Sequence, residues 1–197
     1  MSFKLGLTGS IGMGKSTTAK IFADAGCAVW DADAAVHRLY DVGGAAVLPV
    51  EAMFPDAISG GAVDRGTLRG IIGRNPDALG QVEGIVHPLV RDDREQFAKS
   101  TRSEIVVFDI PLLFETGAEA EMDAVVCVAV SPQLQEKRVL ERGTMTREQF
   151  LAILEKQMPN DEKCKRSDFV IETDTLEHAK QQVHDVLEQI RKQMINA

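Results

Sequence analysis

The sequence predicts an α/β protein with helices on both faces of a parallel β-sheet. Strand-like apolar segments alternate with helix-like segments along all 197 residues, which is typical of such a sheet. Residues 105–108 and 124–130 are continuously apolar, as expected of strands covered on both faces. A glycine-rich turn also joins strand-like residues 3–8 to a helix that begins near Lys15. This order is typical of the first strand-to-helix connection in such folds.

The size and the charge of the chain limit the classes of function. The length fits one domain with a sizeable core, and it leaves room for a small inserted subdomain. Lys and Arg number 22 against 30 Asp and Glu, a net charge of −8, which argues against binding to nucleic acid or to an anionic membrane. The sequence shows neither an 18-residue apolar run nor a signal peptide, so we expect a soluble cytoplasmic protein. Nothing in it indicates an obligate protein partner.

Three cysteines are spread through the chain without a metal-binding spacing. A sparse, odd set is typical of reduced thiols. Cys27 and Cys127 lie in apolar strand-like runs, so we expect both to be buried as small apolar side chains.

Residues 9–16 match the spacing G-x-x-x-x-G-K-[ST] of a P-loop. The glycines let backbone N–H groups turn toward phosphate oxygens, and the following helix points its positive end at the same anion. Lys15 would reach the β- and γ-phosphates, and the Ser16 hydroxyl would complete Mg²⁺ coordination. The residues expected to bind the nucleotide phosphates are Gly9, Gly12, Met13, Gly14, Lys15, Ser16 and Thr17.

The next elements are a helix, a strand and a second helix. The helix is expected from Lys15 to about residue 25, ending at Gly26. Its predicted apolar face consists of Ala19, Phe22 and Ala23. Residues 27–30 form a short strand, and residues 34–40 are helical after Asp31-Ala32-Asp33.

Residues 43–102 have a helical and irregular pattern, with breaks near residues 43–44, 54–56 and 60–61. No segment there resembles a strand of the main sheet, so this span is the candidate substrate-binding region. His87 precedes Pro88 and is expected to cap the start of a helix.

The second half of the chain repeats the strand and helix pattern. The strand 124–130 leads to a helix with Ser131 as its N-cap and Pro132 in its first turn. Gly143 ends that helix, and Thr146 with Gln149 forms a capping box for the next one. The expected apolar stripe of that second helix is Phe150, Leu151, Leu154 and Met158.

A last strand is expected at residues 168–171, and a closing helix from about Leu176. The apolar stripe of this helix consists of Leu176, Ala179, Val183, Val186, Leu187, Ile190 and Met194. Its spacing indicates a structural role.

Three carboxylates follow predicted strands, where the ligand crevice of such a sheet lies. Asp109 ends the strand 105–108 and is placed to hold Mg²⁺ or its water ligands. Asp31 and Asp33 follow the strand 27–30. Either could accept the proton of an acceptor hydroxyl, and either could instead be a helix N-cap.

Basic residues flank the Gly143 break. They are Lys137, Arg138, Arg142 and Arg147. A flexible joint between two capped helices would suit a lid that closes over a nucleotide and excludes water. The alternative is an ordinary solvated helix face.

Several stretches together resemble the bacterial dephospho-coenzyme A kinase family, over about residues 5–190. These stretches are LTGSIGMGKST (7–17), DADAAVHRL (31–39), VDRGTLR (63–69), HPLVR (87–91), FDIPLLFE (108–115) and the run from Gln157 through Lys163. The resemblance implies ATP- and Mg²⁺-dependent phosphorylation of the ribose 3′-hydroxyl of dephospho-CoA. It further implies a P-loop NTPase three-layer fold with a five-stranded parallel sheet.

The resemblance also implies an organisation and a set of roles. The core would comprise about residues 1–33, 103–136 and 167–197, the helical CoA-binding region about 34–102, and the lid about 137–166. Asp33 would be the base or the residue that orients the acceptor hydroxyl, and Asp109 would be linked to the metal. Arg138 and Arg142 would act from the lid, Arg142 in catalysis. Arg65 and His87 would lie in or near the acceptor site.

Two departures from the family pattern affect these expectations. Gly143 stands where the family often has Asp, and Glu172-Thr173-Asp174 replaces a turn resembling Asp-Asn-x-Gly. Adenine contacts after the last strand therefore do not carry over.

Two other functions compete with this interpretation. A P-loop kinase for a nucleoside monophosphate or a sugar acid would not be expected to combine the His-Pro and FDIPLLFE segments. A GTP-dependent switch would need an Asn-Lys-x-Asp guanine reader, and neither Asn75 nor Asn160 is followed by Lys.

Overall fold

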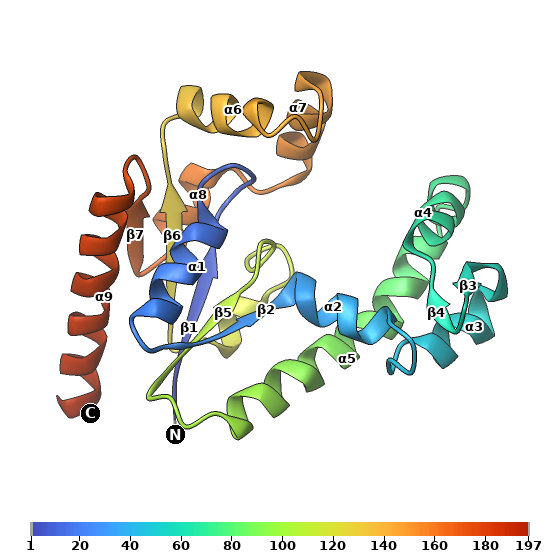
Figure 1. The fold of residues 1–197 in the computed structure, drawn as a ribbon, viewed down its shortest axis with the longest axis horizontal. Helices are drawn as coiled ribbons and strands as arrows, with labels where there is room; N and C mark the ends of the chain where they lie inside the picture. Colours follow the sequence, from blue (N-terminus) through green and yellow to red (C-terminus); the bar gives the residue numbers. More distant parts are fainter. Residues whose placement is uncertain (1, 197) are drawn as a thin grey trace. The chain divides into compact units, whose positions relative to one another are not determined.

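The computed structural model describes residues 2–196, which divide into two compact units. One unit contains the chain up to Trp30 and from Thr101 onward, and the other is Asp31–Ser100. Figure 1 shows the elements of both. Within the described residues, no helix is both long and apolar enough to cross a membrane.

The first unit is built on a five-stranded sheet of order β2-β5-β1-β6-β7. Its strands are β1 (Phe3–Thr8), β2 (Ala28–Asp31), β5 (Ile105–Asp109), β6 (Ala124–Ala129) and β7 (Phe169–Glu172). The pairs β1–β5, β1–β6 and β6–β7 are parallel. Leu7 is aligned with Asp109 across β1 and β5. The predicted five-stranded parallel sheet is confirmed.

The helices of this unit alternate with its strands along the chain. They are α1 (Lys15–Asp24), the short 3-10 helix η2 (Ala118–Glu121), α6 (Pro132–Glu141), α7 (Arg147–Lys156), α8 (Asn160–Arg166) and α9 (Leu176–Asn196). The predicted caps are present: Ser131 caps α6, and Thr146 and Gln149 form the capping box of α7. Gly26 ends α1 in the left-handed conformation at φ 91°, as its position predicts.

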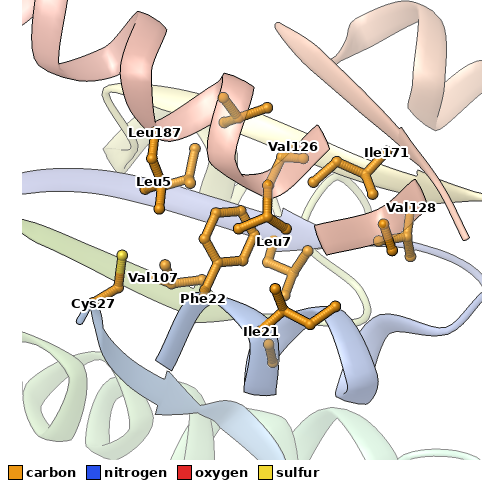
Figure 2. Close-up of a cluster of buried hydrophobic side chains, with 14 of the residues drawn as sticks. Leu5, Leu7, Ile21, Phe22, Cys27, Val107, Val126, Val128, Ile171 and Leu187 are labelled. Carbon is orange, nitrogen blue, oxygen red and sulfur yellow. The ribbon is translucent and has the colours of Figure 1, made fainter. Parts of the chain in front are cut away.

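One face of the sheet packs against α1 and α9 (Figure 2). Leu5 and Leu7 of β1 are completely buried there, together with Phe22 of α1 and Leu187 of α9. The opposite face is covered by the segment after β5: a Cβ on Gly6 would lie 3.0 Å from Leu113. Because both faces are covered, the apolar runs of β5 and β6 need no polar alternation.

The second unit is mainly helical. It contains α2 (Ala32–Tyr40), α3 (Val47–Met53), the 3-10 helix η1 (Pro55–Ala57), β3 (Ile58–Ser59), β4 (Ala62–Val63), α4 (Arg65–Arg74) and α5 (Ala78–Ser100). Strands β3 and β4 form a separate antiparallel hairpin (Figure 1). The second unit has a core of its own, which includes Val50, Ala57 and Leu68. The expectation that this span adds no strand to the main sheet is correct.

The prediction that His87 caps a helix before Pro88 is wrong, because both residues lie inside α5. Proline in a helix interior costs about 3 kcal/mol. Tertiary packing offsets that cost: Val82 and Val86 are buried before the proline, and Leu89 is partly buried after it.

Three other residues differ from their expected burial. Ala23, Leu151 and Leu176 are exposed. On α1, Thr18 and Ile21 are buried with Ala19 and Phe22. The apolar face of α1 is therefore rotated from the predicted one, because the helix packs against both the sheet and α9. Cys27 and Cys127 are buried as predicted, and burial raises the pKa of the Cys27 thiol to about 11.

Candidate functional site: a phosphate loop and its pocket

The loop between β1 and α1 has a backbone that requires glycine at two positions. Gly12 and Gly14 have φ angles of 80° and 88°, in the left-handed region that favours glycine. Neighbouring side chains leave no room for a larger residue. A Cβ on Gly12 would lie 2.5 Å from the Val139 side chain, and one on Gly14 would lie 2.8 Å from the Thr173 hydroxyl. The backbone angles and the neighbouring side chains thus both favour glycine at these two positions of the motif.

Three amide side chains from distant segments hold this loop. The Ser10 N–H donates to Asn160 Oδ1 at 2.9 Å, and the Ile11 N–H donates to Gln157 Oε1 at 3.2 Å. Gln135 Nε2 donates to the Ile11 carbonyl at 2.7 Å. These bonds hold the loop to α6 and to the segment around α8. Sequence reasoning assigned none of these three residues to the loop.

The helix after the loop presents backbone groups suited to binding phosphate. Gly14 is the N-cap of α1, and the N–H groups of the first turn of a helix have no acceptor within that helix. Lys15 forms an ion pair with Asp109, and the Asp109 side chain is 3% exposed. The structure therefore brings two predicted site residues into direct contact at the end of β5.

Helix α1 and strand β5 also carry side-chain oxygens of the kind that Mg²⁺ prefers. Ser16 is exposed in the first turn of α1, and Asp109 is buried at the end of β5. Mg²⁺ prefers oxygen ligands and is usually held by one or two carboxylates together with substrate phosphates. Within residues 2–196 there is no cluster of three or more His, Cys, Asp or Glu that could hold a metal.

A pocket of about 390 Å³ adjoins the phosphate loop. Its lining residues include Gly14, Thr17, Arg138, Arg142 and Leu176. Arg138 and Arg142, predicted from the sequence as nucleotide ligands, thus lie at the same pocket as Thr17. Their side chains add positive charge to it.

The two other basic residues near Gly143 are engaged elsewhere. Arg147 Nε donates to Glu136 Oε1 at 2.5 Å, which joins α7 to α6. Lys137 pairs with Glu141 at 3.8 Å along α6. Neither basic residue lines the pocket. For these two, the alternative of an ordinary helix face is the better interpretation.

A buried lysine supports the segment after Asp109. The Lys163 side chain is completely buried, and its Nζ lies 2.9 Å from Glu115 Oε1 and donates to the Pro111 carbonyl at 2.8 Å. Burial alone would raise the pKa of Glu115. The hydrogen bonds from Lys163 and from the Met158 N–H, with the charge of Lys163, outweigh burial and hold that pKa below 4.5.

This pair predicts a pH-dependent stability difference. Glu115→Gln is expected to lower the free energy of unfolding at pH 7 by about 2 kcal/mol, less than for a fully buried pair because Glu115 is partly exposed. A lowered native pKa adds stability above the unfolded pKa, and this is lost as the pH falls through the native pKa. The stability difference between the wild type and the variant should therefore start to shrink near pH 4.5 and shrink further as the pH falls. Urea titrations at pH 7 and pH 3.5 measure the difference.

The matched control for that variant is Glu95→Gln, which removes an exposed pair with Lys99. It should change stability by about 0.5 kcal/mol or less at either pH. A Glu115→Gln deficit that stays the same at both pH values would contradict the assignment.

The second unit contains the predicted acceptor-side residues. Asp31 is the N-cap of α2, accepting the Ala34 N–H at 2.8 Å, so the capping alternative is correct for Asp31. Asp33 lies exposed in the first turn of the same helix and is not its cap. His87 is exposed on α5.

Arg65 has a partner that the sequence did not indicate. Its Nη1 lies 2.7 Å from His37 Nε2. His37 follows Asp33 by four residues on α2, which places both on one side of the helix. His37 carried no functional signal in the sequence, since a lone histidine is usually structural.

Comparisons with known proteins cover nearly the whole chain. A family model described as dephospho-CoA kinase matches residues 3–178. The dephospho-CoA kinase of Ruegeria pomeroyi is 63% identical over 197 residues, covering 100% of both chains. The dephospho-CoA kinase structure from Campylobacter jejuni has a TM-score of 0.73 at 28% identity and covers 98% of each chain.

A crystal structure of a Thermus thermophilus protein is also similar, with a TM-score of 0.87 at 31% identity. It covers 95% of this chain and 97% of its own. Similarity of this extent is not limited to the phosphate loop and includes both units.

Proposed function

Because the chain belongs to the dephospho-CoA kinase family, we propose that it transfers the γ-phosphate of ATP to the ribose 3′-hydroxyl of dephospho-CoA. The product is coenzyme A, so this is the last step of its synthesis. The observation that carries the proposal is full-length family membership at 63% identity, in a chain whose P-loop lysine contacts the buried Asp109.

On the donor side, Lys15 contributes positive charge to the β- and γ-phosphates, and the first-turn N–H groups of α1 cradle them. Ser16 and Asp109 are the residues that would hold Mg²⁺. When bound, Mg²⁺ would neutralise charge on the phosphate oxygens. The oxygen chemistry of these two side chains and their positions at α1 and β5 support the assignment.

The nucleoside of ATP is proposed to enter the pocket beside the loop. Arg138 and Arg142 supply positive charge there, and Leu176 and Ala179 supply apolar surface. Residues 137–166 are proposed to act as a lid, which would keep water from the γ-phosphate.

On the acceptor side, Asp33 is proposed to accept the proton of the hydroxyl or to orient it. Its exposure and its freedom from the capping role support this function. Arg65 and His87 are proposed to contact dephospho-CoA, within a CoA-binding region of about residues 34–102. We expect the enzyme to act in the cytoplasm.

An acceptor panel tests the proposal. The protein is incubated with ATP and Mg²⁺ and, separately, dephospho-CoA, AMP, dTMP, adenosine or gluconate, and the phosphate position in the product is read by ³¹P NMR. Phosphorylation of dephospho-CoA at the 3′-hydroxyl is expected. Transfer to AMP or gluconate without transfer to dephospho-CoA would refute it. Omitting Mg²⁺, with EDTA present, should abolish turnover.

A further inference from the structure

Thr173 is a buried hydroxyl residue next to the nucleotide pocket, at the first position after β7. It is 6% exposed. Its N–H donates to the Ala129 carbonyl at 2.9 Å, which continues the β6–β7 ladder by one residue. The sheet therefore sets the position of its side chain.

The hydroxyl of Thr173 contacts the phosphate loop at two consecutive residues. Its Oγ1 donates to the Met13 carbonyl at 2.7 Å, a length typical of a strong hydroxyl bond. A Cβ on Gly14 would lie 2.8 Å from the same oxygen. The hydroxyl thus packs directly against the residue that caps α1 and sets the direction of its first N–H groups.

The same oxygen accepts a hydrogen bond from the pocket arginine. Arg138 Nη1 donates to Thr173 Oγ1 at 3.1 Å. Arg138 Nη2 donates to the carbonyls of Thr173 at 2.6 Å and Asp174 at 3.2 Å. A guanidinium has five N–H donors, so two remain beyond these three bonds in the described part of the chain. Three N–H groups of the Arg138 guanidinium thus hold it to Thr173 and Asp174, and the other two can donate to a ligand.

We infer that Thr173 is a positioning residue that links Arg138 to the phosphate loop, so that both bind one ATP in a fixed mutual arrangement. A hydroxyl suits this place because it donates to one neighbour and accepts from the other. A preset arrangement spares part of the ordering entropy that binding would otherwise cost. The inference rests on the proposed use of ATP as phosphate donor.

The test compares two substitutions of the same residue. Thr173→Val keeps the shape and removes the hydroxyl, whereas Thr173→Ser keeps the hydroxyl. Affinity for ATP is measured by calorimetry without acceptor, and KM for ATP, KM for dephospho-CoA and kcat are measured by assay. Thr173→Val should weaken ATP affinity about tenfold, the value of one well-made hydrogen bond. Thr173→Ser should stay within about threefold of the wild type.

Comparing the KM for ATP with the KM for dephospho-CoA distinguishes a positioning role of Thr173 from a general disturbance of the fold. Thr173→Val should raise the KM for ATP about tenfold and change the KM for dephospho-CoA by less than about twofold. In a protein that already carries Arg138→Gln, Thr173→Val should weaken ATP affinity by less than about half the factor that it does alone, because the two residues act as a unit.

Thr116→Val is the matched control. It removes a hydroxyl that donates to the Leu112 carbonyl at 2.8 Å outside the pocket and should leave ATP affinity unchanged.

Wild-type ATP affinity in a folded Thr173→Val protein would overturn the inference. So would a Thr173→Ser protein as weak as Thr173→Val, or full additivity with Arg138→Gln. If Thr173→Val does not fold, Thr173→Cys, whose thiol is a weak donor, takes its place in each comparison. A wild type that binds ATP without phosphorylating dephospho-CoA would refute the proposed function, and the ATP affinities would still decide the role of Thr173.

Discussion

Replacing Lys15 by Ala is expected to reduce kcat/KM about a thousandfold, the loss typical of removing one preorganised charge from a transition state. Lys15 is the first residue of α1 and forms an ion pair with Asp109. Its ammonium therefore lies at the N-terminal end of the helix, where the phosphates are proposed to bind. Steady-state assays with ATP and dephospho-CoA measure the loss. Lys15→Arg keeps the charge but not the compact geometry, and it should recover only part of the activity.

The same substitution should also affect stability, because it takes an ammonium away from the Asp109 carboxylate, whose side chain is 3% exposed. We expect the free energy of unfolding to fall by on the order of 3 kcal/mol. The double variant Lys15→Ala/Asp109→Asn removes the buried charge as well. It should regain much of the stability and none of the turnover. A stable double variant with near wild-type turnover would rule out the role of Lys15.

Replacing Asp33 by Asn is expected to lower kcat by about 10² to 10⁴-fold, the range for loss of a general base. The fold should be unaffected, because Asp33 is exposed and Asp31 caps α2. Circular dichroism and urea titration would verify the fold, and kcat would be measured at saturating ATP and dephospho-CoA.

Asp31→Asn is the matched control, since Asn is as good an N-cap as Asp. It neutralises a carboxylate two positions away and should keep turnover within about threefold of wild type. A folded Asp33→Asn protein with normal turnover would exclude both roles proposed for Asp33.

The strands and most helix ends were predictable, because their signals are local. Ser131, Thr146 and Gln149 cap their helices as the sequence indicates. The errors came where packing outweighs local preference. Pro88 lies inside a 23-residue helix because buried neighbours on both sides of it hold the helix together. Ala23 is exposed because the sheet and α9 determine which side of α1 is buried.

The sequence alone determined the phosphate loop, the parallel sheet and the candidate residues Lys15, Asp109, Arg138 and Arg142, since each depends on spacing or on the end of a local element. Only the tertiary structure decided what holds these residues in place. Asn160 and Thr173 bond to a loop 150 and 160 positions away. Hydrogen bonds between such distant residues leave no period in the sequence, and they exist only after the sheet has brought β1, β6 and β7 side by side.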